Sequence, residues 1–123
     1  MAKVYGAIKA TVKLGDGYNY PYAGLAFNIW NDQQEGADIS AWGGFCLEYQ
    51  STIGFSIELV PENEEDVTAF NNYRATVAKA ASMTTMNFRW DKFRQEAGWG
   101  KEADKDSVLA KTAAVKLNFV NHA

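Results

Sequence analysis

The stretch Asp38–Pro61, DISAWGGFCLEYQSTIGFSIELVP, decides the fold class of this chain. Residues 45–50 and 55–60 each alternate large apolar side chains with polar or small ones, a pattern typical of β-strands that bury one face. Residues 51–54 between them are small and flexible enough for the chain to reverse. We therefore predict two neighbouring strands joined by a short turn.

The lead-in to the first strand places a large aromatic, Trp42, directly before Gly43 and Gly44. A Trp in this position commonly closes the end of a β-sandwich, and the glycines let the backbone bend into the strand. We therefore expect Trp42 to be buried and to have a structural role.

The same period of two recurs along the rest of the chain and predicts further strands, so that the sequence indicates an all-β fold. Residues 91–95 are expected to form a single helical turn, and residues 61–66 and 102–106 are expected to be charged, solvated loops. The apolar positions expected to face the core are Ile8, Ala10, Val12 and Leu14; Leu25, Phe27 and Ile29; Tyr73, Ala75 and Val77; Met86, Phe88 and Trp90; and Val115, Leu117 and Phe119.

Three segments resemble the jelly-roll carbohydrate-binding modules of the galactose-binding-like, family 11 type, which occur in modular cellulolytic bacterial enzymes. Residues 38–44, DISAWGG, are similar to the D-hydrophobic-S-aromatic-x-G segment of those modules. Residues 83–100, MTTMNFRWDKFRQEAGWG, are similar to a strand that ends in an aromatic-Asp-x-Phe turn and a Gln-x-x-Gly-Trp-Gly closure. Residues 107–120 match a region of small residues followed by a hydrophobic strand. The resemblance covers most of residues 20–120.

The resemblance implies a jelly-roll β-sandwich that forms one carbohydrate-binding module over residues 1–123. Its implied function is non-catalytic binding of a β-linked plant-cell-wall glucan, cellulose or mixed-linkage β-glucan, which targets an attached glycoside hydrolase. Trp42, Trp90 and Trp99 match family positions that pack the fold. The family is normally exported, so we expect a secreted or cell-surface location within a larger enzyme, although Met1 is followed by a strand-like pattern and not by a signal peptide. The resemblance also allows a structural calcium ion, for which the sequence shows no clear site.

The chain departs from the family pattern at its end, because those modules usually add one more strand beyond the position of Ala123. We therefore expect an unpaired edge beside residues 115–120, and such an edge is a template for another chain. Pairing with a second copy into a homodimer is the expected consequence. The alternative is that the strand at residues 6–14 fills the gap within one molecule.

Composition excludes several classes of function. The chain has 123 residues and a net charge of -3, which gives no basic footprint for nucleic acid. No apolar run approaches the roughly 20 residues that cross a membrane. One histidine, His122, and one cysteine, Cys46, exclude a standard zinc site and argue against a Ser-His-Asp or Cys-His apparatus. We expect no cofactor, no nucleic-acid partner and no membrane partner.

A sugar-binding site needs an aromatic face for the C–H patches of pyranose rings, together with donors and acceptors for hydroxyls. Trp30 is the strongest aromatic candidate because it is out of phase with the core residues of its strand. Tyr18, Tyr20 and Tyr22 alternate along a loop and would form a second platform. The polar candidates, which lie opposite the expected core faces, are Asn28, Glu48, Gln50, Glu58, Arg74 and Arg89.

Two carboxylates leave more than one interpretation open. We expect Glu48 and Glu58 to be near neighbours across the turn, with Arg74 bridging their like charges. The bridge would clamp sugar hydroxyls, or it would be an ordinary surface ion pair. A further alternative is that Glu48 and Glu58 are the acid and the nucleophile of a glycosidase. A chain of this length has few residues outside its strands that could form the deep cleft such an enzyme needs. A protein-interaction module that keeps the fold and has lost the sugar site is the other alternative.

Overall fold

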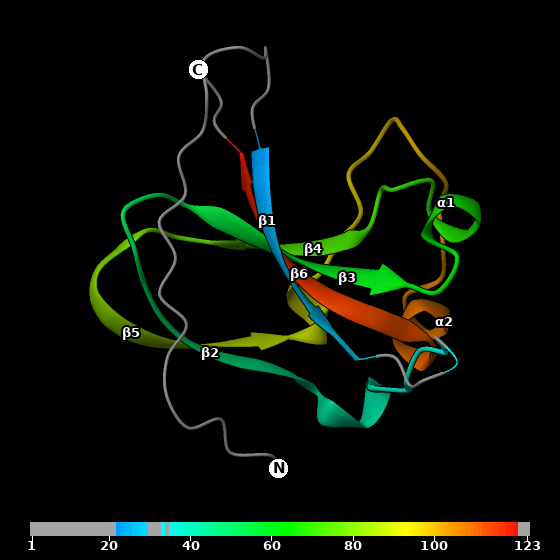
Figure 1. Ribbon diagram of the computed structural model, residues 1–123, viewed down its shortest axis with the longest axis horizontal. Coiled ribbons are helices and arrows are strands. Elements are labelled where there is room, and N and C mark those ends of the chain that lie inside the picture. The colour runs from blue at the N-terminus through cyan, green and yellow to red at the C-terminus, as the bar shows by residue number, and fades with distance from the viewer. Residues whose placement is uncertain (1–21, 30–32, 34, 121–123) are drawn as a thin grey trace.

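The computed structural model describes residues 22–29, 33 and 35–120. Within these residues the chain is mostly β-strand, with two short α-helices and two 3-10 turns, and the strands form two antiparallel sheets (Figure 1). The all-β fold class predicted from the alternating pattern is thereby confirmed. In this described part, no helix is both long and apolar enough to cross a membrane.

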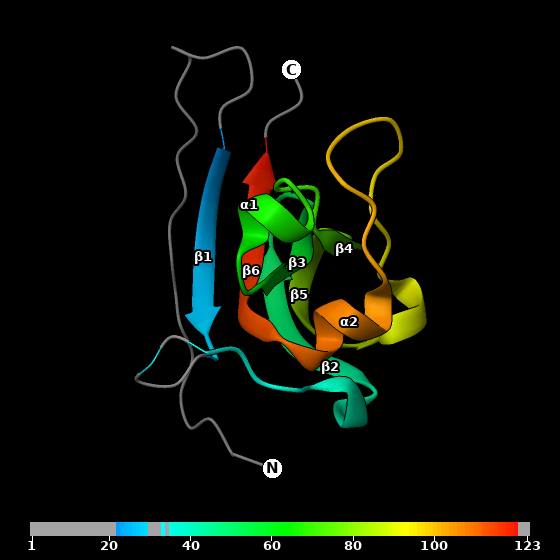
Figure 2. The same cartoon turned by 90° about the vertical axis from the view of Figure 1, so that its right-hand side faces the viewer.

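The larger sheet has four strands in the order β1-β6-β3-β4. These are β1 (Tyr22–Asn28), β6 (Thr112–Val120), β3 (Phe55–Pro61) and β4 (Tyr73–Val77). Figure 2 shows β1 at one side of this sheet, next to β6. The sheet therefore joins the two ends of the described chain to its middle.

The smaller sheet consists of β2 (Gly44–Ser51) and β5 (Ala80–Arg89), which pair antiparallel. Helix α1 (Glu64–Val67) follows β3, and helix α2 (Lys105–Ala110) precedes β6. The two 3-10 turns are Ser40–Trp42, before β2, and Trp90–Lys92, after β5.

The core lies between the two sheets. Alternate residues of β3, Phe55, Ile57 and Leu59, are buried there, as the sequence predicts. Tyr49 of β2 packs edge-on against Phe55, with ring centroids 5.5 Å apart, which links the two sheets. The core cluster is completed by Ile39, Ala75, Val77, Phe88, Phe93, Val108, Leu109 and Phe119.

The segment before β2 is fixed by a local turn. The Asp38 carboxylate accepts hydrogen bonds from the Ser40 hydroxyl at 2.6 Å and the Ser40 backbone N–H at 3.0 Å. These bonds, the side-chain one foremost, lower the pKa of Asp38. The turn directs Ile39, between the two polar residues, fully into the core. The Asp-hydrophobic-Ser pattern therefore has a structural cause in this chain.

The predicted pairing of the strands at residues 45–50 and 55–60 through a short turn is wrong. β2 pairs with β5, whereas β3 pairs with β4 and β6, so residues 52–54 connect the two sheets. An alternating pattern identifies a strand and its buried face but not its partner. The apolar faces of β2 and β3 meet across the core and do not lie side by side in one sheet.

The expected burial of Trp42 is also wrong, because 56% of its surface is exposed. Trp42 ends its 3-10 turn, and Gly43 follows in a left-handed conformation with φ of 75°. Its ring contacts Phe45 only edge-on, at a centroid distance of 5.9 Å. Two further residues expected in the core, Phe27 and Met86, are exposed on β1 and β5.

The expectation of an unpaired edge at residues 115–120 is wrong as well. β6 is flanked on both sides, by β1 and by β3. The predicted strand at residues 6–14 lies outside the described residues. The predicted loop at residues 102–106 is in part helix, because Asp104 caps α2 by accepting from the Ser107 backbone N–H at 3.2 Å.

Candidate functional site

The outer face of the four-stranded sheet carries an unusual group of charged residues. Glu58 of β3 lies directly opposite Arg74 of β4 and Lys116 of β6. Residues opposed in this way share one face of a sheet. Since their neighbours Ile57 and Leu59 point into the core, these three side chains lie on the opposite, outer face.

Glu58 is buried although it lies on this outer face, with 4% of its surface exposed. Its Oε1 atom is 3.3 Å from Arg74 Nη2. Burial is the main influence on the carboxyl group and raises the pKa of Glu58, against the opposing effects of Arg74 and Lys116. Its second oxygen, Oε2, has no hydrogen-bond partner among the described residues.

Arg74 connects Glu58 to a loop that follows β5. Its Nη1 atom is 3.0 Å from Glu96 Oε1. Its Cζ atom lies 6.0 Å from the centroid of the Trp99 ring, in the range of a cation–π contact. We call Glu58, Arg74, Glu96 and Trp99 the Arg74 cluster.

Trp99 is presented to solvent by a rigid part of the loop. Its ring is 46% exposed, and its Nε1–H donates to Glu96 Oε2 at 3.0 Å. The buried Asn71 side chain donates to the carbonyls of both Glu96 and Trp99 at 2.8 Å and accepts from the Glu96 backbone N–H at 3.1 Å. The indole ring is therefore exposed but held in place.

The loop at residues 94–104, which leads from β5 to α2 in Figure 1, is held by further hydrogen bonds. Gln95 donates to the carbonyls of Asn71 and Lys101 at 2.8 Å and accepts from the Ala103 backbone N–H at 3.0 Å. Gly100 has φ of 70°, and a Cβ atom there would lie 2.4 Å from Asn71 Cβ. These contacts give a structural reason for the Gln-x-x-Gly-Trp-Gly pattern.

The outer face can make the contacts that a polyhydroxylated ligand needs. Trp99 offers an apolar ring face, Arg74 and Lys116 are donors, and the exposed carboxylate of Glu96 is an acceptor. The side-chain oxygen of Asn118 on β6 is buried and has no hydrogen-bond partner among the described residues. In that same part of the chain no group of three or more His, Cys, Asp or Glu residues is placed to hold a metal ion.

The structure brings some of the predicted site residues together. Arg74 contacts Glu58, as predicted, and Asn28 shares their sheet face through its register with Ala114 of β6. The predicted proximity of Glu48 and Glu58 is wrong, because Glu48 belongs to β2 in the other sheet.

The remaining predicted residues are dispersed or outside the description. Gln50 and Arg89 also lie in the smaller sheet, where Gln50 donates to the Ala81 carbonyl at 2.8 Å. Tyr22 begins β1, but its side chain lies outside the described part. Trp30, Tyr18 and Tyr20 lie outside it altogether.

Two members of the Arg74 cluster were not among the predicted site residues. Trp99 was expected to pack the fold, and Glu96 was not singled out. The signal that points to Trp99 is its position between Gly98 and Gly100, which both adopt positive φ. Glu96 has no comparable signal, because only the folded loop brings it to Arg74.

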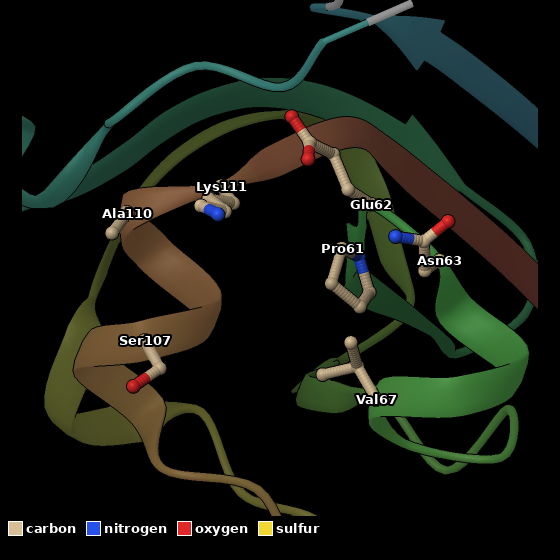
Figure 3. A pocket seen from close by; sticks show the side chains of 7 residues that line it. All are labelled: Pro61, Glu62, Asn63, Val67, Ser107, Ala110 and Lys111. Carbon is tan, nitrogen blue, oxygen red and sulfur yellow. The ribbon is translucent and has the colours of Figure 1, made fainter.

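A separate hollow of about 420 Å³ lies between α1 and α2 (Figure 3). None of its lining side chains is aromatic, so it offers no platform for a sugar ring. The carboxylate of Glu62 is engaged with the Gly36 backbone N–H. The residues that line it are Pro61, Glu62, Asn63, Val67, Ser107, Ala110 and Lys111.

The function of the Arg74 cluster has to be inferred from its own chemistry. No protein-family model, no curated protein and no solved structure matches this chain.

Proposed function

We propose that residues 1–123 form a non-catalytic carbohydrate-binding module with a jelly-roll β-sandwich of the galactose-binding-like type. Its ligand is a β-linked plant-cell-wall glucan, either cellulose or mixed-linkage β-glucan. The glucan binds on the outer face of the four-stranded sheet, at the Arg74 cluster. The module acts outside the cell or at its surface, as part of a larger enzyme, and brings an attached glycoside hydrolase to its substrate.

The observation that carries this proposal is the fixed, half-exposed ring of Trp99 beside the Arg74 guanidinium. A pyranose ring stacks its C–H patch on an indole face, and its hydroxyls require donors and acceptors nearby. Arg74 supplies the donors, and the exposed carboxylate of Glu96 supplies the acceptors.

The arrangement of carboxylates supports binding without hydrolysis. A retaining glycosidase needs two carboxyl groups that flank the bond to be cleaved. The pair considered from the sequence, Glu48 and Glu58, is divided between the two sheets. Glu58 and Glu96 are instead both engaged by the same guanidinium.

We expect a modest affinity. One or two stacked rings contribute about 1 kcal/mol each beyond the burial of their area. Immobilising the sugar chain offsets part of this gain. The dissociation constant should therefore lie roughly between micromolar and millimolar values.

Affinity electrophoresis against cellulose derivatives, mixed-linkage glucan, xylan and mannan tests the proposal. We expect retardation in gels that contain a β-glucan, and a Trp99→Ala variant that is retarded clearly less than the wild type at the same polysaccharide concentration. Equal migration of the wild-type protein in all gels contradicts the proposal.

A specific observation favours a second candidate, a protein-interaction module that also forms homodimers. Trp42, Met83 and Met86 are exposed on or beside the smaller sheet. Within the described residues β2 and β5 pair only with each other, which leaves an outer edge on each. Light scattering over a dilution series tests this: a dimer that dissociates on dilution supports it, and a monomer at all concentrations contradicts it.

A further inference from the structure

We propose that Phe70 is a second aromatic contact for the ligand, so that one glucan chain is held by the rings of Trp99 and Phe70 together. This inference rests on the proposed function and adds a binding residue to it. It also places the ligand over the turn that precedes β4, where Phe70 lies.

The turn that carries Phe70, between α1 and β4, lies beside the loop that carries Trp99 (Figure 1). On one side of Phe70, the backbone carbonyl of Thr68 accepts from the Lys101 backbone N–H at 2.9 Å. On the other side, the Asn71 amide donates to the Trp99 carbonyl at 2.8 Å. The two aromatic residues therefore project from backbone segments that are in contact with each other.

The side chain of Phe70 is accessible to a ligand. It is 55% exposed, and Trp99 beside it is 46% exposed. Within the described part of the chain, the Phe70 ring packs against no other aromatic ring and no cation. Single exposed apolar residues are common on protein surfaces. Two exposed aromatic rings on neighbouring segments are instead suited to the C–H patches of a sugar chain.

The backbone of this turn is strained. Ala69 and Phe70 both have positive φ, of 50° and 67°. A left-handed residue often follows the end of a helix, but it is usually Gly, because a Cβ atom is unfavourable in this conformation. Among the large apolar residues exposed in the described part, Phe70 alone has a positive φ. Both the backbone and the contact with solvent would therefore favour a smaller residue at this position.

This cost indicates a role for the ring outside the fold. Strained backbone conformations persist where the surrounding structure holds them, and they are frequent at ligand-binding positions. Here Gln95 Nε2 donates to the Asn71 carbonyl at 2.8 Å, which holds the residue that follows Phe70. The Phe70 ring thus starts from a fixed backbone, as the Trp99 ring does, and less freedom is lost when a ligand binds.

Calorimetric titration of the full chain with cellotetraose tests the inference. Phe70→Ala removes the ring and keeps the Cβ atom, Phe70→Gly removes both, and Phe70→Tyr keeps the ring. Phe27→Ala is the matched control, because Phe27 is also exposed but lies on β1, at the opposite edge of the four-stranded sheet from β4.

We expect Phe70→Ala and Phe70→Gly to bind cellotetraose about fivefold more weakly than the wild type, the middle of the range for one aromatic contact. Phe70→Tyr and Phe27→Ala should bind like the wild type. Phe70→Gly should unfold at a higher temperature than Phe70→Ala, because Gly adopts positive φ without a Cβ clash. Weaker binding by a variant that folds better cannot be attributed to unfolding.

The inference is overturned if Phe70→Ala binds cellotetraose like the wild type, or if Phe70→Tyr or Phe27→Ala loses as much affinity as Phe70→Ala. A Phe70→Gly variant that unfolds below Phe70→Ala also contradicts it, since the turn is then not strained. In each of these cases the proposed function stands, provided that Trp99→Ala weakens binding. If the wild-type protein binds neither cellotetraose nor any β-glucan, the proposed function is wrong and the inference falls with it.

Discussion

The side-chain amide of Asn71 donates a hydrogen bond of 2.8 Å to the backbone carbonyl of Trp99, 28 residues further along the chain. A buried residue that directly precedes Asn72 and β4 thereby fixes the position of an exposed aromatic ring. A ring that is already in place loses little conformational freedom when a ligand binds. This connection makes Trp99 suitable as a binding platform. It also means that a substitution at Asn71 tests the role of Trp99.

Replacing Asn71 should damage both the fold and the binding site. Asn71→Ala removes three hydrogen bonds to the loop, among them the one that the backbone N–H of Glu96 donates. We expect the free energy of unfolding to fall by about 2–4 kcal/mol, as for the loss of several buried hydrogen bonds. Urea denaturation measures this change. A loss below about 0.5 kcal/mol, the usual effect of a surface substitution, would show that the loop is held by other contacts.

The two glycines beside Trp99 form a matched pair of test positions. Both have positive φ, but a Cβ atom at Gly98 meets nothing within 4 Å, whereas one at Gly100 would collide with Asn71 and the Thr68 carbonyl. Gly98→Ala should cost about 1–2 kcal/mol from backbone strain alone. Gly100→Ala should cost clearly more, as thermal unfolding of the two variants will show. Equal costs would contradict the tight contact of Gly100.

Arg74 should be needed for stability because it is the ion-pair partner of a buried carboxylate. Its side chain is 20% exposed and that of Glu58 is 6% exposed. Arg74→Ala should lower the free energy of unfolding by about 3 kcal/mol, the low end for breaking a buried pair. The control is Arg89→Ala, at an exposed position of the other sheet, which should have little effect.

The double variant Glu58→Gln/Arg74→Met separates the two causes of this loss. Removing the charge at Glu58 together with Arg74 leaves no unpaired ion, so the double variant should be more stable than the single variant Arg74→Met, which has the same side chain at position 74. A double variant that is no more stable than Arg74→Met would show that lost packing, and not the unpaired charge, causes the loss.

The buried Glu58 should also make stability depend on pH. Burial raises the pKa of Glu58 above its usual 4.5, and the nearby Glu64 and Glu96 act in the same direction. The folded protein then holds the proton more tightly than the unfolded chain, so protonation favours folding. The stabilising contribution is full below pH 4.5 and is lost as pH rises through the raised pKa of the folded protein.

Glu58→Gln removes this titration and is the reference for measuring it. We expect the difference in unfolding free energy, wild type minus variant, to decrease as pH rises from below 4.5 to neutrality. Urea denaturation at several pH values gives this difference. A difference that increases over the same range would mean that the ion pair with Arg74 outweighs the effect of burial.

The sequence is sufficient to predict most strands but not their pairing. The alternation of Phe55, Ile57 and Leu59 identifies both the strand and its buried face. It carries no information on the partner, so β2 was wrongly placed beside β3. Pairing depends on contacts between distant segments, such as β1 with β6, that no local pattern encodes.

Part of the candidate site could likewise be predicted from the alternation along the strands. Arg74 and Glu58 are each out of phase with the core residues of their strands, and the predicted contact between them is confirmed. Glu96 and Trp99 lie in a loop without a regular period, where phase gives no direction. The expected burial of Trp42 is wrong: it ends a 3-10 turn that is followed by Gly43 in a left-handed conformation, and its side chain is exposed.

The most direct test of the central claim compares two exposed tryptophans, Trp99 at the Arg74 cluster and Trp42 near the smaller sheet. Titration of mixed-linkage glucan into Trp99→Ala should show binding weakened about tenfold, the upper range for loss of an aromatic contact. Its thermal midpoint should change little, since the ring is half exposed. Trp42→Ala should bind like the wild type. The account is contradicted if Trp99→Ala binds normally, or if Trp42→Ala is the variant that loses binding.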